Sequence, residues 1–309
     1  MDDKSINEHV VKLLLADHKR DRRWRNIRFF ITLTLATLFF IYALFPNWLD
    51  FTVTKRDKPY VALVRLTGMI APEQDFSAEA AIPLLVSAFE DKDAKAVVLD
   101  INSGGGTVVQ SAIIYDRLMM LKVQYPNKPL IVIGEDMLAS GAYLVALAAD
   151  KIYVNANTFT GSIGVVSKGF GFTTAMQKVG VSRRTFTAGV NKDRFDPFEP
   201  LTEGDMTKIK GLLTQTHQYF IGLVKKSRGA KLKGNSQQLF SGDFWRGEEA
   251  LKLGLVDGLG NVADVLQREF NVDYYRDYSV EPSFVQQVVR NMGVQMNAFL
   301  TPTLLYAGV

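Results

Sequence analysis

The sequence predicts an α/β domain built on a parallel sheet, because strand and helix patterns alternate along most of the chain. Three observations carry this prediction: short runs of consecutive apolar residues, longer amphipathic stretches, and turn residues between them. Apolar strands without polar alternation are typical of a parallel sheet that helices cover on both faces. With 309 residues, 47% of them hydrophobic, the chain can bury such a core.

The first element is an apolar segment that follows a basic tail. Residues 29–49 contain no charged side chain, and at about 1.5 Å per residue they would reach about 31 Å, which matches a hydrocarbon core of roughly 30 Å. We therefore expect one transmembrane helix. Six cations against one acid in residues 19–28 place the tail, residues 1–28, in the cytoplasm by the positive-inside rule, and the rest of the chain outside.

Two other interpretations of the apolar segment stay open. A cleaved signal peptide would need a shorter apolar core and a small-x-small cleavage site, and neither is evident after Leu49. A buried core helix is the second alternative, although such a helix normally carries polar positions over six turns. Residues 50–59 form a polar linker in either case, and the outer domain extends over residues 60–280.

The outer domain begins with alternating strands and helices. Buried strands are expected over residues 60–66, 95–101 and 130–134, and helices over residues 77–91 and 108–122. A short apolar helix over residues 141–149 follows, and then the apolar segment 151–155 and a Gly-punctuated stretch, residues 160–171.

The second half of the domain is mainly helical. A long amphipathic helix begins near Thr202, which supplies the N-cap before acidic residues in the first turn, and runs into the 220s. A basic, polar loop over residues 228–238 precedes two short helices near residues 248–253 and 262–270. Residues 281–309 have the apolar spacing of an amphipathic helix, which we expect to be a separate C-terminal extension.

Composition excludes several kinds of site. Without cysteine there are no disulfides, thiol nucleophiles or thiolate metal ligands. Two of the three histidines precede the apolar segment, so the outer domain contains only His217, and we expect no metal and no organic cofactor. Residues 1–28 account for +3 of the net charge of +4, so the remaining chain lacks the basic footprint of a nucleic-acid-binding protein.

The histidine count also limits nucleophilic catalysis. His217 lies in the middle of an expected helix with no motif around it, and we interpret it as a surface histidine. A Ser-His-Asp triad in the outer domain would have to use this residue, whereas a Ser-Lys dyad needs no histidine. A lysine serves as a base only where apolar surroundings lower its pKa toward neutrality.

The segment DINSGGGT (100–107) lies directly after an expected strand and before a helix. Its glycines would let backbone amides approach a ligand or a developing oxyanion near the helix N-terminus. Phosphate binding is an alternative, but neither the GxGxxG nor the GxxxxGKS spacing is present. A plain strand-to-helix turn explains the glycines equally well.

The segment MLASGAYLVALAADK (137–151) places Ser140 at the start of an apolar helix. Its neighbours Ala139 and Gly141 are small, so a substrate could approach, and the Gly141 amide would point to where an oxyanion forms. By spacing alone, a helix N-cap is the better interpretation of Ser140.

Together the two motifs resemble the crotonase and Clp-protease superfamily, and within it the signal peptide peptidase A (protease IV) family of membrane-anchored Ser-Lys peptidases. The similarity covers about residues 60–270, in four blocks: INSGGG (101–106), LASGAYLVALAADKIYVNANTFTGSIGVV (138–166), TAGVNKDRFDPFEPLTEGD (187–205) and FWRGEEALKLGLVDGLG (244–260). The resemblance implies a crotonase/Clp-protease-like domain of sheet and helices after one transmembrane helix. The family commonly has Ser-Pro-Gly-Gly where this chain has Ser103-Gly104-Gly105-Gly106, a change that leaves the amides available.

The resemblance also implies a role for individual residues. It makes Ser140 the nucleophile, Lys192 the general base, Ser162 the hydroxyl that orients the lysine, and Gly141 with one of Gly105 or Gly106 the oxyanion donors. Without the resemblance nothing in the sequence favours Lys192 over Lys168 or Lys151.

The function expected from the resemblance is that of a membrane-anchored serine endopeptidase. It would degrade cleaved signal peptides and other apolar or unfolded peptides on the periplasmic side of a bacterial inner membrane, as a homo-oligomer whose subunits enclose a cavity. One alternative is a catalytically idle scaffold or peptide-binding protein with the same fold. The other is a crotonase-type acyl-CoA enzyme. The membrane anchor argues against it, and so does the low net charge of the outer domain, which shows no evident basic patch for the CoA phosphates.

Overall fold

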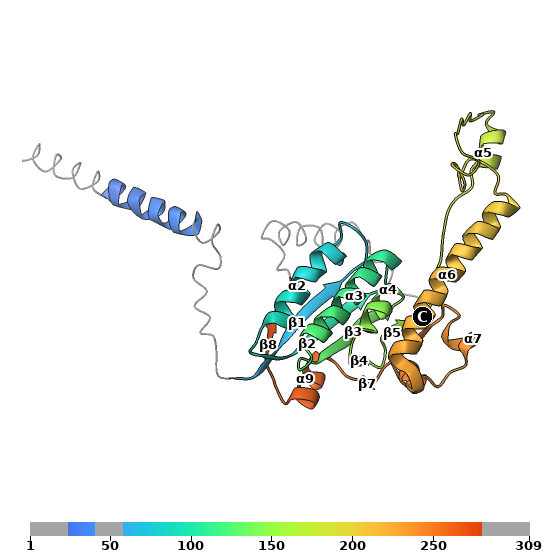
Figure 1. Ribbon diagram of the computed structural model, residues 1–309. Helices are drawn as coiled ribbons and strands as arrows, with labels where there is room; N and C mark the ends of the chain where they lie inside the picture. The colour runs from blue at the N-terminus through green and yellow to red at the C-terminus, as the bar shows by residue number, and fades with distance from the viewer. Residues whose placement is uncertain (1–23, 41–57, 280–309) are drawn as a thin grey trace, which may run out of the picture. The chain divides into compact units, whose positions relative to one another are not determined.

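The computed structural model describes residues 24–40 and 58–279 (Figure 1). The chain divides into two units between Asp57 and Lys58. In the first unit residues 24–40 are helical, so the expected transmembrane segment overlaps this helix only as far as residue 40. Among the helices of the described ranges, none is both long and apolar enough to cross a bilayer. The rest of that segment and the extension over residues 281–309 lie outside the described residues.

The second unit is built on an eight-stranded sheet with the order β6-β5-β3-β2-β1-β8, in which β4 also pairs with β3, and β7 with β4. Every strand pair is parallel except β5 with β6. The predicted α/β class is therefore confirmed, with one antiparallel edge. The strands are β1 (Tyr60–Thr67), β2 (Ala94–Ser103), β3 (Leu130–Ala139), β4 (Lys151–Val154), β5 (Phe159–Gly161), β6 (Phe244–Arg246), β7 (Gly258–Leu259) and β8 (Tyr275–Asp277).

The predicted helices form with small shifts at their ends. The long helix has the expected cap, because Thr202 accepts from the Asp205 amide while the Asp205 side chain accepts from the Thr202 amide. The loop predicted over residues 228–238 is wrong in part, since it contains two short helical turns. The helices are α2 (Ala78–Glu90), α3 (Val108–Gln124), α4 (Gly141–Ala146), α5 (Thr173–Lys178), α6 (Glu203–Arg228), η2 (Gly229–Lys231), α7 (Ser236–Leu239), α8 (Gly247–Lys252) and α9 (Val262–Phe270).

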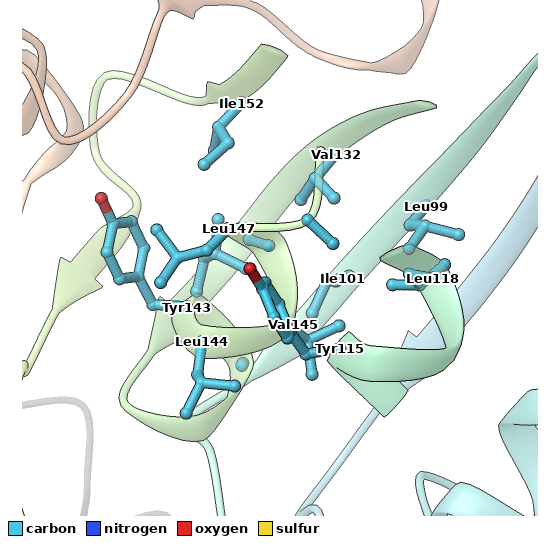
Figure 2. Close-up of a cluster of buried hydrophobic side chains, with 14 of the residues drawn as sticks. Leu99, Ile101, Tyr115, Leu118, Val132, Tyr143, Leu144, Val145, Leu147 and Ile152 are labelled. Atoms are coloured by element: carbon cyan, nitrogen blue, oxygen red, sulfur yellow. The ribbon is translucent and has the colours of Figure 1, made fainter. Parts of the chain in front are cut away.

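The two faces of the sheet are covered unequally. On β2, Leu99 and Ile101 belong to the main core beneath α2 and α3, whereas Val98 belongs to a smaller cluster that includes residues of α9. The strand period of two explains this alternation. Figure 2 shows the main core, where the side chains of α4 lie close to those of α3 and the sheet. All residues of α4 are buried, which fixes the position of the turn before it.

One part of the second unit has no buried residue. From Gly164 to Tyr219 every side chain is exposed or half-buried. We call residues 167–212 the arm; it includes α5 and the first turns of α6, which Figure 1 shows standing away from the sheet. The arm folds on itself through Phe172, which stacks on Phe198 with ring centroids 5.4 Å apart, and through the ion pair of Arg183 with Asp196.

Candidate active site

Ser140 lies in the sharp turn between β3 and α4. Its amide donates to the Gly161 carbonyl at 2.8 Å, and its backbone has φ 52° and ψ −123°, a conformation that costs a non-glycine residue free energy. The Ser140 hydroxyl makes no capping hydrogen bond to α4. Ser140 therefore occupies the N-cap position of α4, as its spacing predicted, but its side chain does not cap the helix. A strained strand-to-helix turn with an unused hydroxyl is typical of a nucleophile.

The glycine turn after β2 contacts the Ser140 turn directly. A side chain at Gly105, where φ is 99°, would bring its Cβ to 2.6 Å from the Gly141 nitrogen and 2.8 Å from the Ser140 Cβ. A Cβ on Gly141 would lie 3.1 Å from the Gly106 nitrogen. Two amides from separate turns therefore meet beside Ser140, an arrangement that glycine alone permits.

The Gly106 and Gly141 amides differ from the Gly105 amide in their hydrogen bonding. Among the backbone hydrogen bonds of the described turns and loops, neither the Gly106 nor the Gly141 amide is a donor. The Gly105 amide donates to the Ser103 hydroxyl at 3.1 Å. The Gly106 and Gly141 amides are thus the pair available to an oxygen placed above Ser140.

Ser140 opens into a cleft with a volume of about 740 Å³, which we call the Ser140 cleft. Ser162 lines the same cleft from the turn after β5, where its φ is 49° and its amide donates to the Asp243 carbonyl at 2.7 Å. The structure therefore brings together Ser140, Ser162 and the glycine turn. The other lining residues include Met69, Thr107, Val108, Gly164, Val165, Val166 and Ser241.

His217 also lines the Ser140 cleft, so the prediction that it is a surface histidine without a site is wrong. The residue is half-buried, and its Nε2 lies 3.0 Å from the Ile163 carbonyl oxygen, to which it donates because a carbonyl can only accept. The helical spacing of the sequence indicates that His217 lies on the buried face of its helix. His217, Phe220, Ile221 and Val224 follow an i, i+3, i+4, i+7 pattern, and the last three are buried.

Lys192 is not brought to this cleft. It is exposed, lies in a turn of the arm where its amide donates to the Gly189 carbonyl at 3.1 Å, and does not line the Ser140 cleft. Lys168 is exposed as well, and Lys151 forms an ion pair with Glu269. In the described part of the chain, no lysine lines the cleft.

The described residues also contain no group of three or more histidine or acidic side chains placed to hold a metal ion. The chemistry available at the Ser140 cleft is therefore that of hydroxyls, backbone amides and one imidazole.

Comparison with known proteins places this site in a family. The model of "Peptidase family S49" matches residues 122–271, a segment that contains Ser140, Ser162 and Lys192. The chain is 43% identical over 205 residues to the "Na(+)/H(+) antiporter NhaA" of Brucella abortus, a match that covers 66% of this chain and 28% of that protein. The chain thus spans less than a third of the length of that relative. The name of the relative refers to its whole, much longer chain.

Two further relatives have peptidase names. The chain is 32% identical over 177 residues to the "Putative signal peptide peptidase SppA" of Enterococcus faecium, covering 57% of this chain and 51% of that protein. It is 30% identical over 207 residues to the "Putative protease slr0021" of Synechocystis sp., covering 67% of this chain and 72% of that protein. Because this last match spans more than two thirds of the relative, and the family model matches the segment around Ser140, the chain belongs to peptidase family S49, a family of serine peptidases.

Proposed function

We propose that this protein is a serine endopeptidase in which Ser140 attacks the peptide carbonyl. One observation carries the proposal: the strained Ser140 turn presents an uncapped hydroxyl beside the amides of Gly106 and Gly141. Donors fixed in this way stabilise the oxyanion of an acyl-transfer intermediate without reorganising. The free Gly106 amide favours Gly106 over Gly105 as the second donor, since Gly105 already donates to Ser103.

Lys192 is our proposed general base. As a free amine it takes the Ser140 proton while Oγ bonds to the carbonyl carbon, and it returns that proton to the leaving amine as the C–N bond breaks. Water then adds to the acyl-enzyme, gives up a proton to Lys192, and releases the carboxylic acid as Ser140 regains its hydrogen. The Ser162 hydroxyl, which faces the same cleft, would accept from the lysine amine and orient it.

The exposed position of Lys192 gives this proposal a structural requirement. A lysine that is surrounded by water keeps its proton and cannot act as a base at neutral pH. We propose that the arm of a second copy delivers Lys192 to the Ser140 cleft in a homo-oligomer. The arm favours such a contact, because Val190 is 100% exposed and Phe186 93% exposed, and burying apolar side chains stabilises association.

We further propose membrane anchoring through residues 29–49 with the peptidase domain on the periplasmic side. The support is the uncharged stretch and the basic residues before it. Cleaved signal peptides and other apolar or unfolded segments are the proposed substrates. The resemblance stated above and the name of the Enterococcus faecium relative support this class.

His217 supports a second candidate mechanism, in which an imidazole rather than a lysine is the base. It lines the cleft of Ser140, and because Nε2 donates to the Ile163 carbonyl, Nδ1 is the nitrogen that would take the Ser140 proton. This candidate needs no second copy. The catalytically idle scaffold predicts instead that the folded protein cleaves nothing.

The test is cleavage of casein and of an unstructured apolar peptide by the full chain in detergent. We expect Ser140→Ala and Lys192→Ala to fall to background, while the matched controls Ser87→Ala and Lys226→Ala keep wild-type activity, because both control residues are exposed and lie outside the cleft and the arm. Activity that survives Lys192→Ala but not His217→Ala would select the imidazole mechanism. A folded wild-type protein inert on every peptide would favour the scaffold.

A further inference from the structure

A second cleft lies on the sheet face opposite α2 and α3. Its volume is about 990 Å³, and its walls come from the ends of β1, β2 and β3, from α9 and from residues 272–275; we call it the Asp100 cleft. It shares no lining residue with the Ser140 cleft. Any ligand bound here would therefore occupy a site separate from the proposed catalytic one.

Asp100 is the notable group in this cleft. It continues the alternation of Ala96 and Val98 on β2, so its side chain points to the α9 face of the sheet. The residue is only 3% exposed, and within the described residues its Oδ1 has no hydrogen-bond partner. A buried carboxylate oxygen without a partner is costly, and a ligand that donates to it would recover that cost.

Arg65 is the cation next to Asp100, and its guanidinium also binds other groups. The Nε of Arg65 lies 3.5 Å from Asp100 Oδ2, but the same guanidinium pairs with Asp277 and donates to the Tyr275 hydroxyl at 3.0 Å. The cleft lining carries four carboxyl groups, Asp100, Glu135, Asp136 and Asp273, against this one arginine. The cleft thus has an excess of negative charge, which favours a cation.

The remaining wall is mainly apolar. Its apolar lining includes Ile133, Leu266, Val272, Met137 and Phe159. A ligand that suits this lining needs an aliphatic body and a cationic head, the combination found in lysine and arginine side chains and in alkyl amines. A metal ion fits less well, because no group of three acidic or histidine side chains in the described residues could hold one.

We propose that the Asp100 cleft binds an aliphatic amine or guanidine, with its charged nitrogen donating to Asp100 Oδ1 and its stem on Ile133, Leu266 and Val272. A lysine-bearing peptide segment and a free alkyl amine share this chemistry. Because the two clefts are separate, this site does not depend on whether Ser140 and Lys192 are catalytic.

Binding is coupled to a proton. Burial, with the nearby Glu135 charge, raises the pKa of Asp100 to about 7, although Arg65 opposes the shift. The titratable groups that line the cleft with Asp100 are Arg65 from β1, Glu135 and Asp136 from β3, Tyr275 from β8, and Asp273; Asp277 of β8 pairs with Arg65. A cationic ligand prefers the ionised carboxyl, so its affinity is expected to increase as pH rises through about 7.

The experiment measures ligand-dependent changes in melting temperature of the full chain in detergent, at constant ionic strength. A ligand that binds only the folded state raises this temperature. We expect n-butylammonium to raise it, and neutral butanol and anionic butyrate to have no such effect. A capped Gly-Lys-Gly peptide, compared with Gly-Gln-Gly in the Ser140→Ala background, tests the peptide source.

The variant Asp100→Asn keeps the side-chain shape and removes the charge. We expect it to weaken butylammonium binding at least tenfold while the protein stays folded by circular dichroism, and Glu135→Gln to weaken it less. The matched control Glu90→Gln neutralises an exposed carboxylate at the end of α2 and should bind as wild type. Equal shifts with butanol and butylammonium, or unchanged binding in folded Asp100→Asn, would overturn the proposal.

Discussion

Gly104 and Gly106 belong to one turn, yet a side chain at the two positions would meet different surroundings. A Cβ on Gly106 would collide with the Ile70 backbone, which pairs with this turn, whereas a Cβ on Gly104 would lie 3.3 Å from the flexible end of Met137. We expect Gly106→Ala to lower the free energy of unfolding by about 2 kcal/mol or more and to remove cleavage. Gly104→Ala, the matched control, should stay within about 1 kcal/mol of wild type. Denaturant unfolding followed by circular dichroism compares the two, and equal stability would contradict the close approach at Gly106.

His217 is the residue whose replacement separates two roles. Suppose that His217 only donates to the Ile163 carbonyl. His217→Gln can then keep a donor near that oxygen, whereas His217→Ala should lower the free energy of unfolding by about 1 kcal/mol and reduce activity in part. If it is the base, both variants should be inactive. The measurement is kcat/KM against pH for all three proteins. We expect the Gln variant to retain most of the activity and the shape of the wild-type profile.

The sequence predicted the site residues unevenly. Ser140 and the glycine turn could be placed because each follows an apolar strand, and parallel strands end at a common edge. Spacing alone nevertheless favoured an N-cap for Ser140, since the pattern does not reveal backbone angles. The prediction of a surface position for His217 is wrong because His217 lies on the same helix face as Phe220, Ile221 and Val224, which are buried. Lys192 came from the resemblance alone, and the structure of one chain leaves it exposed.

At the scale of elements, one ion pair joins the end of α6 to the segment before β7. Arg228, buried in the core, donates to both Asp257 oxygens at 2.7 and 3.2 Å, and Asp257 also accepts from the Ile152 amide of β4. Burial acts to raise the pKa of Asp257, but the hydrogen bonds from Arg228 and Lys231 outweigh it and hold the pKa below its ordinary value of 3.8. The pair therefore stabilises the fold above about pH 3.8, and this contribution is lost as pH falls through the lower native pKa.

Replacing the two cations should have unequal effects. Arg228→Met leaves a buried carboxylate with fewer partners and is expected to cost about 3 kcal/mol, whereas Lys231→Ala removes a half-exposed cation and should cost less than about 1 kcal/mol. Urea unfolding at pH 7 measures both. In Asp257→Asn the dependence of stability on pH below 4 should be weaker than in wild type; an unchanged dependence would assign the acid sensitivity to other carboxylates.

The elements that the sequence predicted are those with strong local signals. Strands β1 to β3 each contain a run of consecutive apolar residues, and α2 and α6 have Ser77 and Thr202 as capping residues. The elements that were missed are short and depend on tertiary contacts. Strand β5 pairs with both β3 and the antiparallel β6, and α7 consists of one turn capped by Asn235. Three- or four-residue elements lack a period that a sequence pattern could reveal.

For the whole molecule, the exposed arm is the feature that a single chain does not explain. Eleven large apolar or aromatic side chains of the arm are at least 40% exposed, among them Phe170, Phe186 and Val190. Exposed apolar side chains in such number usually mark an interface. We expect Val190→Asp to shift the mass of the detergent-solubilised protein toward smaller species and to reduce cleavage. Val123→Asp, at an 80% exposed position on α3, is the matched control and should change neither.

Mixing two inactive variants tests whether one catalytic site is made from two copies. In Ser140→Ala the arm still carries Lys192, and in Lys192→Ala the cleft still carries Ser140. If the arm of one copy serves the cleft of the next, co-assembly from equal amounts should place an intact arm at an intact cleft in about a quarter of the sites, because each neighbouring pair combines at random across a head-to-tail interface. We therefore expect cleavage of casein to recover to about a quarter of the wild-type rate after dissociation and reassembly.

If each chain uses its own Lys192, or if His217 is the base and Lys192→Ala is already active, mixing will produce no such recovery. Adding Val190→Asp to both variants should abolish the recovered activity, since the arm then no longer docks on its neighbour.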